Sequence, residues 1–260
     1  MLARAFGSGA TAAARGYSYK LGDALYLALT DRCTSCTMLA TRGPGFVMPA
    51  TSGFSPLGDR PEPMPDDLAH IVDEHYSTGV TIVGMGENDS GVTFGGFGEP
   101  TLRLDALLDT GAPTAVLSTY LKSTTSVLMV QNHSCRLMPS ATFLPMLPVR
   151  LVQESRHGVP FRVLTNGLLA PEAAARLAEG GVGRASVALM SANPAQYASL
   201  MRPLGGRGHV DVCQFVVALA EAGVEVECTA VKAPGVNVRD VQLLSEALGA
   251  TTFRARDYFA

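Results

Sequence analysis

Two cysteines that follow a short apolar run are the residues of this sequence best suited to chemistry. The run at 26–29 predicts a strand, and Cys33 and Cys36 lie in the loop directly after it. Thiol groups at the end of a strand are typical of a metal site or an iron–sulfur cluster at the mouth of an α/β fold. Cys33 and Cys36 are therefore the candidate metal ligands.

A lone Cys-x-x-Cys pair leaves several interpretations open. The same spacing occurs in half of a zinc site, in a thiol–disulfide pair and as two unreactive cysteines. A zinc site needs further ligands, and His133 with Cys135 is the nearest group that offers them. A redox pair normally begins a helix, whereas Pro44 would end a helix here quickly.

A glycine-rich loop follows the next predicted strand, at 91–97. Its members Gly96, Phe97, Gly98 and Glu99 are candidate cofactor-binding residues, because glycine lets a ligand approach the backbone and the glutamate adds a carboxylate. The alternative is a glycine-rich turn that carries a surface glutamate.

Three other patterns contain groups that could bind a ligand. Thr165 and Asn166 come at the end of a third predicted strand and could reach the same ligand, although Asn-Gly first of all indicates a turn. The run Arg-Gly-Pro-Gly-Phe at 42–46 could offer backbone donors to an anion, but a flexible connector is favoured. His70 and His75 are five residues apart, which is not the spacing of a helical metal pair.

The elements that must position these residues alternate along the chain. Residues 211–222 place apolar side chains at i, i+3, i+4 and i+7, which predicts one buried helix face. The repeated βα order implies a parallel sheet covered by helices, as an open doubly wound sheet or as a full or partial barrel. The predicted strands are 23–30, 91–97, 160–164, 184–189, 224–231 and 252–256, and the predicted helices are 66–76, 171–179, 211–222 and 238–248.

Composition sets further limits. A chain of 260 residues that is 47% hydrophobic can bury a sizeable core, and one main α/β domain at about 21–260 is expected. The net charge of -3 gives no basic excess, so nucleic acid is not indicated and a small-molecule or protein substrate is expected. Cys213 and Cys228 are expected to be buried as small hydrophobic residues. The odd number of cysteines favours a reducing compartment. No apolar run reaches the ~20 residues that are needed to cross a bilayer.

Two segments depart from the rest of the sequence. Residues 1–20 contain Arg4, Arg15 and Lys20 and no acid, which is typical of a mitochondrial or plastid transit peptide; the alternative is a disordered N-terminus of a cytoplasmic protein. Residues 111–149 are rich in Ser, Thr, Pro and Met without a sustained period. This insertion is a functional lid, a disordered excursion or a retained piece of unspliced sequence, and the last two are favoured.

Taken together, several segments resemble the radical SAM enzymes, most closely the TatD-linked radical SAM group. The resemblance covers most of 23–258 apart from the insertion and the loop after Cys36. It implies a partial (β/α) barrel that holds a [4Fe–4S] cluster by three cysteines and binds S-adenosyl-L-methionine at the fourth iron, with Gly96, Phe97, Gly98 and Glu99 as the methionine-amino motif. The matching segments are Leu-Ala-Leu-Thr-Asp-Arg-Cys-Thr-Ser-Cys-Thr at 27–37, the glycine-rich run at 92–104, and 162–168, 186–189 and 253–258.

The chain departs from that family at the cluster loop. The family pattern is Cys-x3-Cys-x2-Cys, whereas Leu39 stands here where the third thiol belongs, and leucine does not ligate iron. Two functions follow as expectations. One is a radical SAM enzyme with an unknown substrate, in which Cys135, water or a small thiol completes the site. The other is a catalytically inactive barrel that binds a ligand or a protein.

Overall fold

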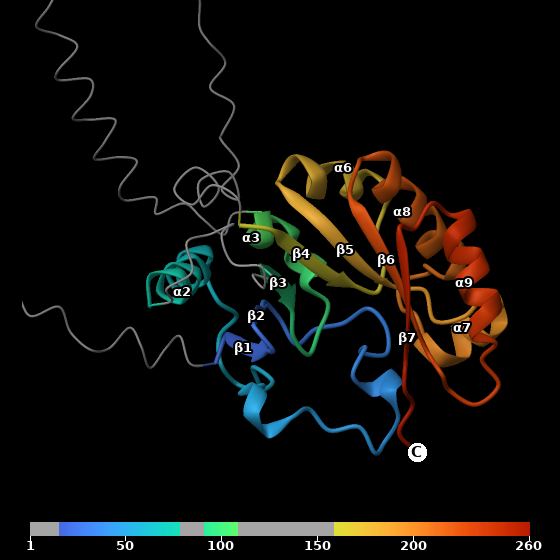
Figure 1. Cartoon of the computed structure of the whole chain (residues 1–260), viewed down its shortest axis with the longest axis horizontal. Helices are drawn as coiled ribbons and strands as arrows, with labels where there is room; N and C mark the ends of the chain where they lie inside the picture. Colours follow the sequence, from blue (N-terminus) through green and yellow to red (C-terminus); the bar gives the residue numbers. More distant parts are fainter. Residues whose placement is uncertain (1–15, 79–90, 109–158) are drawn as a thin grey trace, which may run out of the picture.

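The described residues of the computed structural model, 16–78, 91–108 and 159–260, form an open seven-stranded sheet whose strands follow one another in chain order (Figure 1). The first pair is an antiparallel hairpin, and all later pairs are parallel. The strands are β1 (Ser18–Leu21), β2 (Ala24–Ala28), β3 (Val92–Gly95), β4 (Phe161–Thr165), β5 (Val182–Ala188), β6 (Glu225–Val231) and β7 (Thr252–Arg256). The α/β fold is the partial (β/α) barrel that the sequence predicted.

Helices pack on one face of this sheet, and Figure 1 shows α6, α8 and α9 lying along β5, β6 and β7. The other face is concave, and the long segment after β2 passes below it. The α-helices are α2 (Pro65–Thr78), α3 (Leu104–Leu108), α6 (Glu172–Glu179), α7 (Pro194–Met201), α8 (His209–Glu221) and α9 (Val238–Ala247), and the short 3-10 helices are η1 (Ala40–Arg42), η2 (Ala50–Ser52) and η3 (Pro100–Arg103).

Alternation along the strands separates the two faces. In β4, Phe161, Val163 and Thr165 are buried, while the intervening Arg162 and Leu164 are half-buried on the concave face. The predicted face of α8 is buried as expected, through Val212, Phe215, Val216 and Leu219. The sheet therefore has an apolar side under the helices and a more polar side that faces the concavity.

Both predicted structural cysteines pack into this core. Cys228 is buried in β6, as predicted, whereas Cys213 in α8 is only partly buried against the core. Burial raises the pKa of the Cys228 thiol to about 12 and also raises the pKa of the Cys213 thiol. Neither thiol is therefore activated as a nucleophile.

Strand β1 and helix α7 are among the elements that were not predicted from the sequence. Strand β1 begins at Ser18, inside the segment interpreted as a leader, so the domain starts by residue 16 and not at 21. Helix α7 was also missed, although Asn193 caps it by accepting a hydrogen bond from the Gln196 backbone N–H at 3.0 Å. The remaining leader residues 1–15 and the insertion at 111–149 lie outside the described residues, and their interpretations stay predictions. No helix within the described ranges is long and apolar enough to span a membrane.

One carboxylate ties the concave side of the sheet together. Glu227 in β6 accepts hydrogen bonds from Arg162 at 2.6 Å and from Ser186 at 2.7 Å, and its second oxygen lies 2.8 Å from Arg254. These contacts connect β4, β5, β6 and β7. Burial alone would raise the pKa of the Glu227 carboxyl, but the Ser186 hydroxyl and the neighbouring arginines outweigh it and lower that pKa.

We expect Glu227→Gln to reduce the free energy of unfolding by about 1.5–3 kcal/mol at neutral pH, because charge-assisted hydrogen bonds are lost. A carboxyl whose pKa is lowered by folding stabilises above its unfolded pKa and stops doing so as the pH falls through its folded pKa. The difference between wild type and variant should therefore shrink below the ordinary value of 4.5. Urea unfolding across this pH range measures it.

Glu225→Gln is the matched control on the same strand. Glu225 forms an exposed ion pair with Arg184 at 2.6 Å, so its loss should cost no more than about 1 kcal/mol. Equal losses for the two variants at every pH would contradict the role assigned to Glu227.

Candidate ligand-binding site

Three loops meet at the carboxyl edge of β2, β3 and β4, and we call this meeting point the strand-end junction. It consists of the cysteine loop at 30–36, the glycine loop at 96–99 and the loop at 165–167. The Gly98 N–H donates to the Thr30 carbonyl at 3.2 Å, and the Glu99 N–H donates to the Arg32 carbonyl at 2.8 Å. Parallel strands end on the same edge of a sheet, so loops that are far apart in sequence become neighbours here.

Asn166 connects all three loops of the junction. Its side-chain amide donates to the hydroxyl groups of Thr34 and Ser35, both at 3.0 Å, and lies 3.7 Å from the Cys33 sulfur. Its backbone N–H donates to the Glu99 carboxylate at 2.6 Å. The structure thus brings together predicted residues from segments more than a hundred positions apart.

The Glu99 carboxylate is buried and already occupied. One oxygen accepts from both the backbone N–H and the hydroxyl of Thr101, and the other accepts from Asn166. The Thr165 hydroxyl also hydrogen-bonds to it. A carboxylate has about four lone-pair positions, so no strong acceptor position is left for a ligand ammonium group. Burial raises the pKa of the Glu99 carboxyl, and these hydrogen bonds only partly oppose that rise.

The Thr165 side chain stabilises the loop at 165–167 to which it belongs. It is fully buried, and its hydroxyl accepts a hydrogen bond from the Gly167 N–H at 3.0 Å. Both residues predicted at the end of β4 have side chains that reach another loop. The Thr165 hydroxyl reaches Glu99 in the glycine loop, whereas the Asn166 amide reaches the cysteine loop.

The glycines of the junction are required by packing. A Cβ on Gly98 would lie 2.3 Å from the Arg32 carbonyl oxygen, so any side chain there would separate the glycine loop from the cysteine loop. Gly96 has a φ of 115°, which disfavours side chains, and its Cβ would lie 3.0 Å from that of Ala28. Phe97 differs from both, because its side chain is 37% exposed.

The cysteine loop holds two free thiols. Cys33 and Cys36 are both partly exposed, and the Cys36 N–H donates to the Met201 carbonyl at 2.6 Å, which fixes the loop on α7. Leu39 lines a cavity where a third thiol would be needed. Within the described ranges no three His, Cys, Asp or Glu side chains gather as metal ligands. These residues therefore do not fit a [4Fe–4S] cluster held by three thiolates; His133 and Cys135 lie outside the described residues.

The glycine-containing run at 42–46 is neither a connector nor a backbone anion site. The Gly45 N–H donates to the Phe259 carbonyl at 3.2 Å, and the Phe259 N–H donates to the Arg42 carbonyl at 2.8 Å. A Cβ on Gly43 would lie 2.1 Å from the Phe259 carbonyl oxygen. The run is therefore shaped to pair with the last residues of the chain, and its backbone donors are in use.

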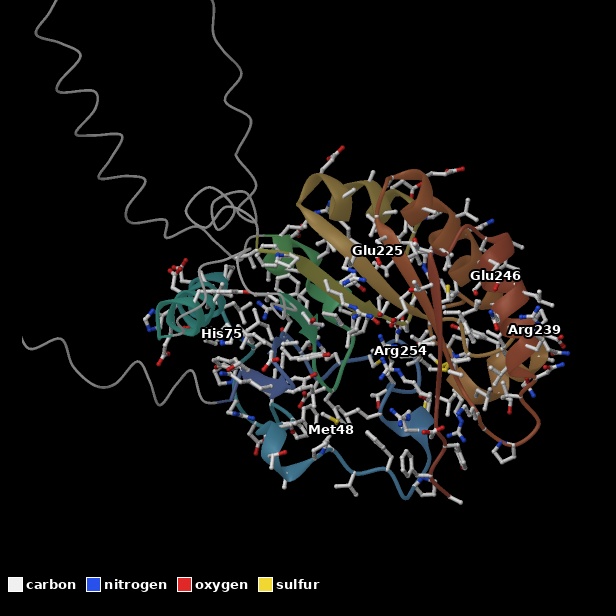
Figure 2. The ribbon with its side chains drawn as sticks, viewed as in Figure 1. Met48, His75, Glu225, Arg239, Glu246 and Arg254 are labelled. Atoms are coloured by element: carbon white, nitrogen blue, oxygen red, sulfur yellow. The ribbon has the colours of Figure 1, made fainter. Side chains whose placement is uncertain are left out.

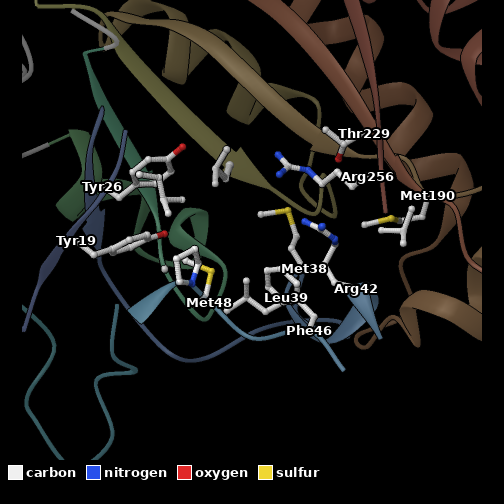
Figure 3. A pocket seen from close by; sticks show the side chains of 15 residues that line it. Tyr19, Tyr26, Met38, Leu39, Arg42, Phe46, Met48, Met190, Thr229 and Arg256 are labelled. Carbon is white, nitrogen blue, oxygen red and sulfur yellow. The ribbon is translucent and has the colours of Figure 1, made fainter. Parts of the chain in front are cut away.

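A cavity of about 250 Å³ lies on the concave side next to the junction, with Gly96 in its wall (Figure 3). Tyr19 and Tyr26 line one side, and Arg42 and Arg256 line the other. None of these four side chains was predicted as a ligand contact, although Arg42 and Arg256 lie in the runs at 42–46 and 253–258 that the sequence analysis names. The Arg-Ala-Arg pattern at 254–256 was a usable signal, because alternate residues of a strand face the same side.

Comparison with known proteins gives similarity of structure only. No family model and no curated protein matches the chain. The structure of Streptococcus suis SuiB bound to precursor peptide SuiA has a TM-score of 0.55 at 14% identity, over 90% of this chain and 39% of that one. Native anSMEcpe with bound AdoMet has a TM-score of 0.50 at 13% identity, over 90% and 51%.

HydG, a maturase of the [FeFe]-hydrogenase, has a TM-score of 0.50 at 12% identity, over 91% of this chain and 42% of that one. This chain thus spans between 39% and 51% of the length of these three proteins. All are radical SAM enzymes. At such low identity the likeness establishes the fold, which is the partial barrel of that superfamily, and nothing about substrate.

Gly98→Ala should lower the free energy of unfolding by about 1–3 kcal/mol, because the added methyl group meets the backbone of the cysteine loop. Gly183→Ala is the matched control, since a Cβ there has no neighbour within 4 Å. The control should change stability by less than about 0.5 kcal/mol. Denaturant unfolding of both variants measures this, and equal effects would show that the two loops are not in close contact.

Asn166→Ala should release the cysteine loop and speed the alkylation of Cys33, measured by mass spectrometry of the labelled peptide. Asn237→Ala removes a similar bond, the one that caps α9 at the Arg239 N–H at 3.1 Å, but at a distance from the thiols. Cys33 should therefore react at the wild-type rate in that control. Unchanged reactivity in Asn166→Ala would contradict the role of Asn166 as the connector.

Proposed function

We propose that this protein binds S-adenosylmethionine at the strand-end junction and is a ligand-binding module of the radical SAM fold without cluster-dependent chemistry. The observation that carries the proposal is the convergence of the cysteine loop, the glycine loop and Asn166 at one edge. Open α/β sheets bind ligands at the carboxyl ends of their strands.

The fold neighbours support the choice of ligand. SuiB was also solved bound to S-adenosylmethionine, with a TM-score of 0.54 at 12% identity over 90% of this chain and 41% of that one. In this chain the backbone carbonyls of the glycine loop would accept hydrogen bonds from the ligand ammonium group. The exposed ring of Phe97 would cover an apolar part of the ligand. The Glu99 carboxylate is not assigned this task, because its acceptor positions are taken.

The missing thiol supports the binding module over the enzyme, the two functions expected from the sequence. A cluster needs a third protein ligand, and Leu39 and Met38 offer only apolar contacts next to the cysteine loop. A ligand-binding role needs no iron. The binding module is therefore the better supported function.

A radical SAM enzyme is the second candidate, and one observation favours it. Cys33 and Cys36 are free, partly exposed and next to the glycine loop, which is where cluster ligands would be required. A third ligand from a part of the chain outside the described ranges would complete such a site. The substrate of such an enzyme is not indicated by any residue of the junction.

Calorimetric titration of S-adenosylmethionine into metal-free protein tests the proposal. We expect saturable binding that persists when Cys33 and Cys36 are both replaced by serine, and only traces of iron and sulfide after anaerobic reconstitution. Phe97→Ala should weaken binding about tenfold, because stacking of a ring contributes on the order of 1 kcal/mol or more. Leu102→Ala, which trims another exposed apolar side chain in η3, should leave binding unchanged.

Two other results would overturn the proposal. Stoichiometric iron and sulfide together with dithionite-dependent cleavage of S-adenosylmethionine would establish the enzyme instead. No binding of S-adenosylmethionine, with or without iron, would remove both functions and leave only the fold.

A further inference from the structure

The cavity on the concave side has an apolar wall and a cationic wall. The rings of Tyr19 and Tyr26 stack with their centroids 4.9 Å apart, and Leu164 and Met190 extend the apolar wall. Opposite them, Figure 3 shows Arg42 from the segment after β2 and Arg256 from β7, with both guanidinium groups directed into the cavity. The two arginines come from segments that are more than two hundred residues apart.

The Arg256 side chain has no hydrogen bond or ion pair within the described part of the chain, although the residue is half-buried. The carboxylates near it are already engaged. Glu227 contacts Arg254 at 2.8 Å, and Asp257 contacts Lys232 at 2.8 Å. The Arg256 guanidinium therefore faces the cavity with its donors free of described partners.

Arg42 is only partly engaged. One of its N–H groups donates to the Asp257 carbonyl at 2.8 Å, and the guanidinium carbon lies 4.5 Å from the ring centroid of Phe46 and 5.4 Å from that of Phe259. The aromatic rings hold the group in position and leave its other donors directed toward the cavity. Arg42 and Arg256 thus form an ordered cationic pole.

Among the described residues no carboxylate forms an ion pair with either arginine of this pole, since the nearby Glu227 and Asp257 pair with Arg254 and Lys232. Burial is the main cause that lowers the pKa of Arg256; the positive charges of Arg254 and Arg42 also lower it, whereas Glu227 and Tyr26 raise it. Burial also lowers the pKa of Arg42, and the charge of Asp257 only partly opposes this. Arginine stays charged in proteins, so the free energy cost of this arrangement is relieved by an anion and not by loss of a proton.

The charge of the residues that line the cavity also disfavours a cationic ligand. Among the described residues that line it there is no aspartate or glutamate. S-adenosylmethionine carries a sulfonium and an ammonium group against one carboxylate, so its net positive charge is disfavoured here. The cavity and the strand-end junction are neighbours through Gly96, but their charges select different ligands.

We infer that this cavity binds a second small molecule, one with a compact anionic group, carboxylate or phosphate, on an apolar body. The anion lies between Arg42 and Arg256, and the apolar body lies against Tyr19 and Tyr26. Guanidinium groups suit this task because they donate paired hydrogen bonds to carboxylate and phosphate oxygens. The inference goes beyond the proposed binding of S-adenosylmethionine and does not depend on it.

Calorimetric titration with matched probes tests the site. Benzoate and phenyl phosphate should bind to the wild-type protein and raise its melting temperature, whereas benzamide and phenol, which lack the charge, should not. Whichever anion binds more tightly identifies the group. Arg256→Met keeps the apolar stem and should weaken binding of the anions at least tenfold; Arg239→Met, at an exposed position on α9 (Figure 2), should leave it unchanged.

The ligand-free protein offers an independent readout. Replacing a half-buried cation whose side chain has no ion pair among the described residues should leave the melting temperature of Arg256→Met equal to or above that of wild type, whereas an arginine with a structural role would lower it. Should this variant not fold, labelling of wild type by phenylglyoxal replaces it. Benzoate or phenyl phosphate should then protect Arg42 and Arg256, but not Arg239, from modification.

Three results would overturn the inference. They are failure of both anions to bind at millimolar concentration, equal binding by Arg256→Met, and displacement of benzoate by S-adenosylmethionine in direct competition. The last would assign the pole to the carboxylate of the nucleoside ligand. Loss of S-adenosylmethionine binding with retained anion binding would refute only the function proposed for the junction.

Discussion

The buried carboxylate of Glu99 is the interaction on which the arrangement of the loops depends. It accepts backbone and hydroxyl hydrogen bonds from η3 on one side and from the end of β4 on the other. An acidic group without water is stable only when such donors surround it, so the two loops have a single favourable relative position. Asn166 then transmits this position to the cysteine loop through its hydrogen bonds to Thr34 and Ser35.

Much of this fold could be predicted from the sequence because it follows from the periodic spacing of apolar residues. Residues 211–222 repeat apolar side chains with a helical period and do form α8, and the strands from β3 to β7 were each expected within a few residues. Strand β1 was missed because it directly follows a stretch of small residues, and its pairing partner, not its composition, determines it. Helix α7 was missed because the spacing of its apolar residues is only weakly helical. The clearer signal in its sequence is the N-cap residue Asn193.

The site was predictable in position but not in detail. Strand ends identified Cys33, Glu99 and Asn166, and the loops that carry them do come together. The sequence identifies Glu99 as a carboxylate but does not show that it is buried. A carboxylate whose acceptor positions are already filled therefore looked like a free ligand group. Arg42 and Arg256 could not be paired from sequence, because their proximity depends on the curvature of the whole sheet and on contacts that only the folded chain makes.

The contact between the run at 42–46 and the end of the chain has a consequence for folding. Arg42 and Asp257 are separated by 215 positions, so one wall of the cavity forms only when the last strand has joined the sheet. Contacts of such high sequence separation form late and slowly, and the segments that make them remain open until then. The cavity would therefore close only after β7 has joined the sheet, and its occupancy would report that the segments at 42–46 and 257–259 have met.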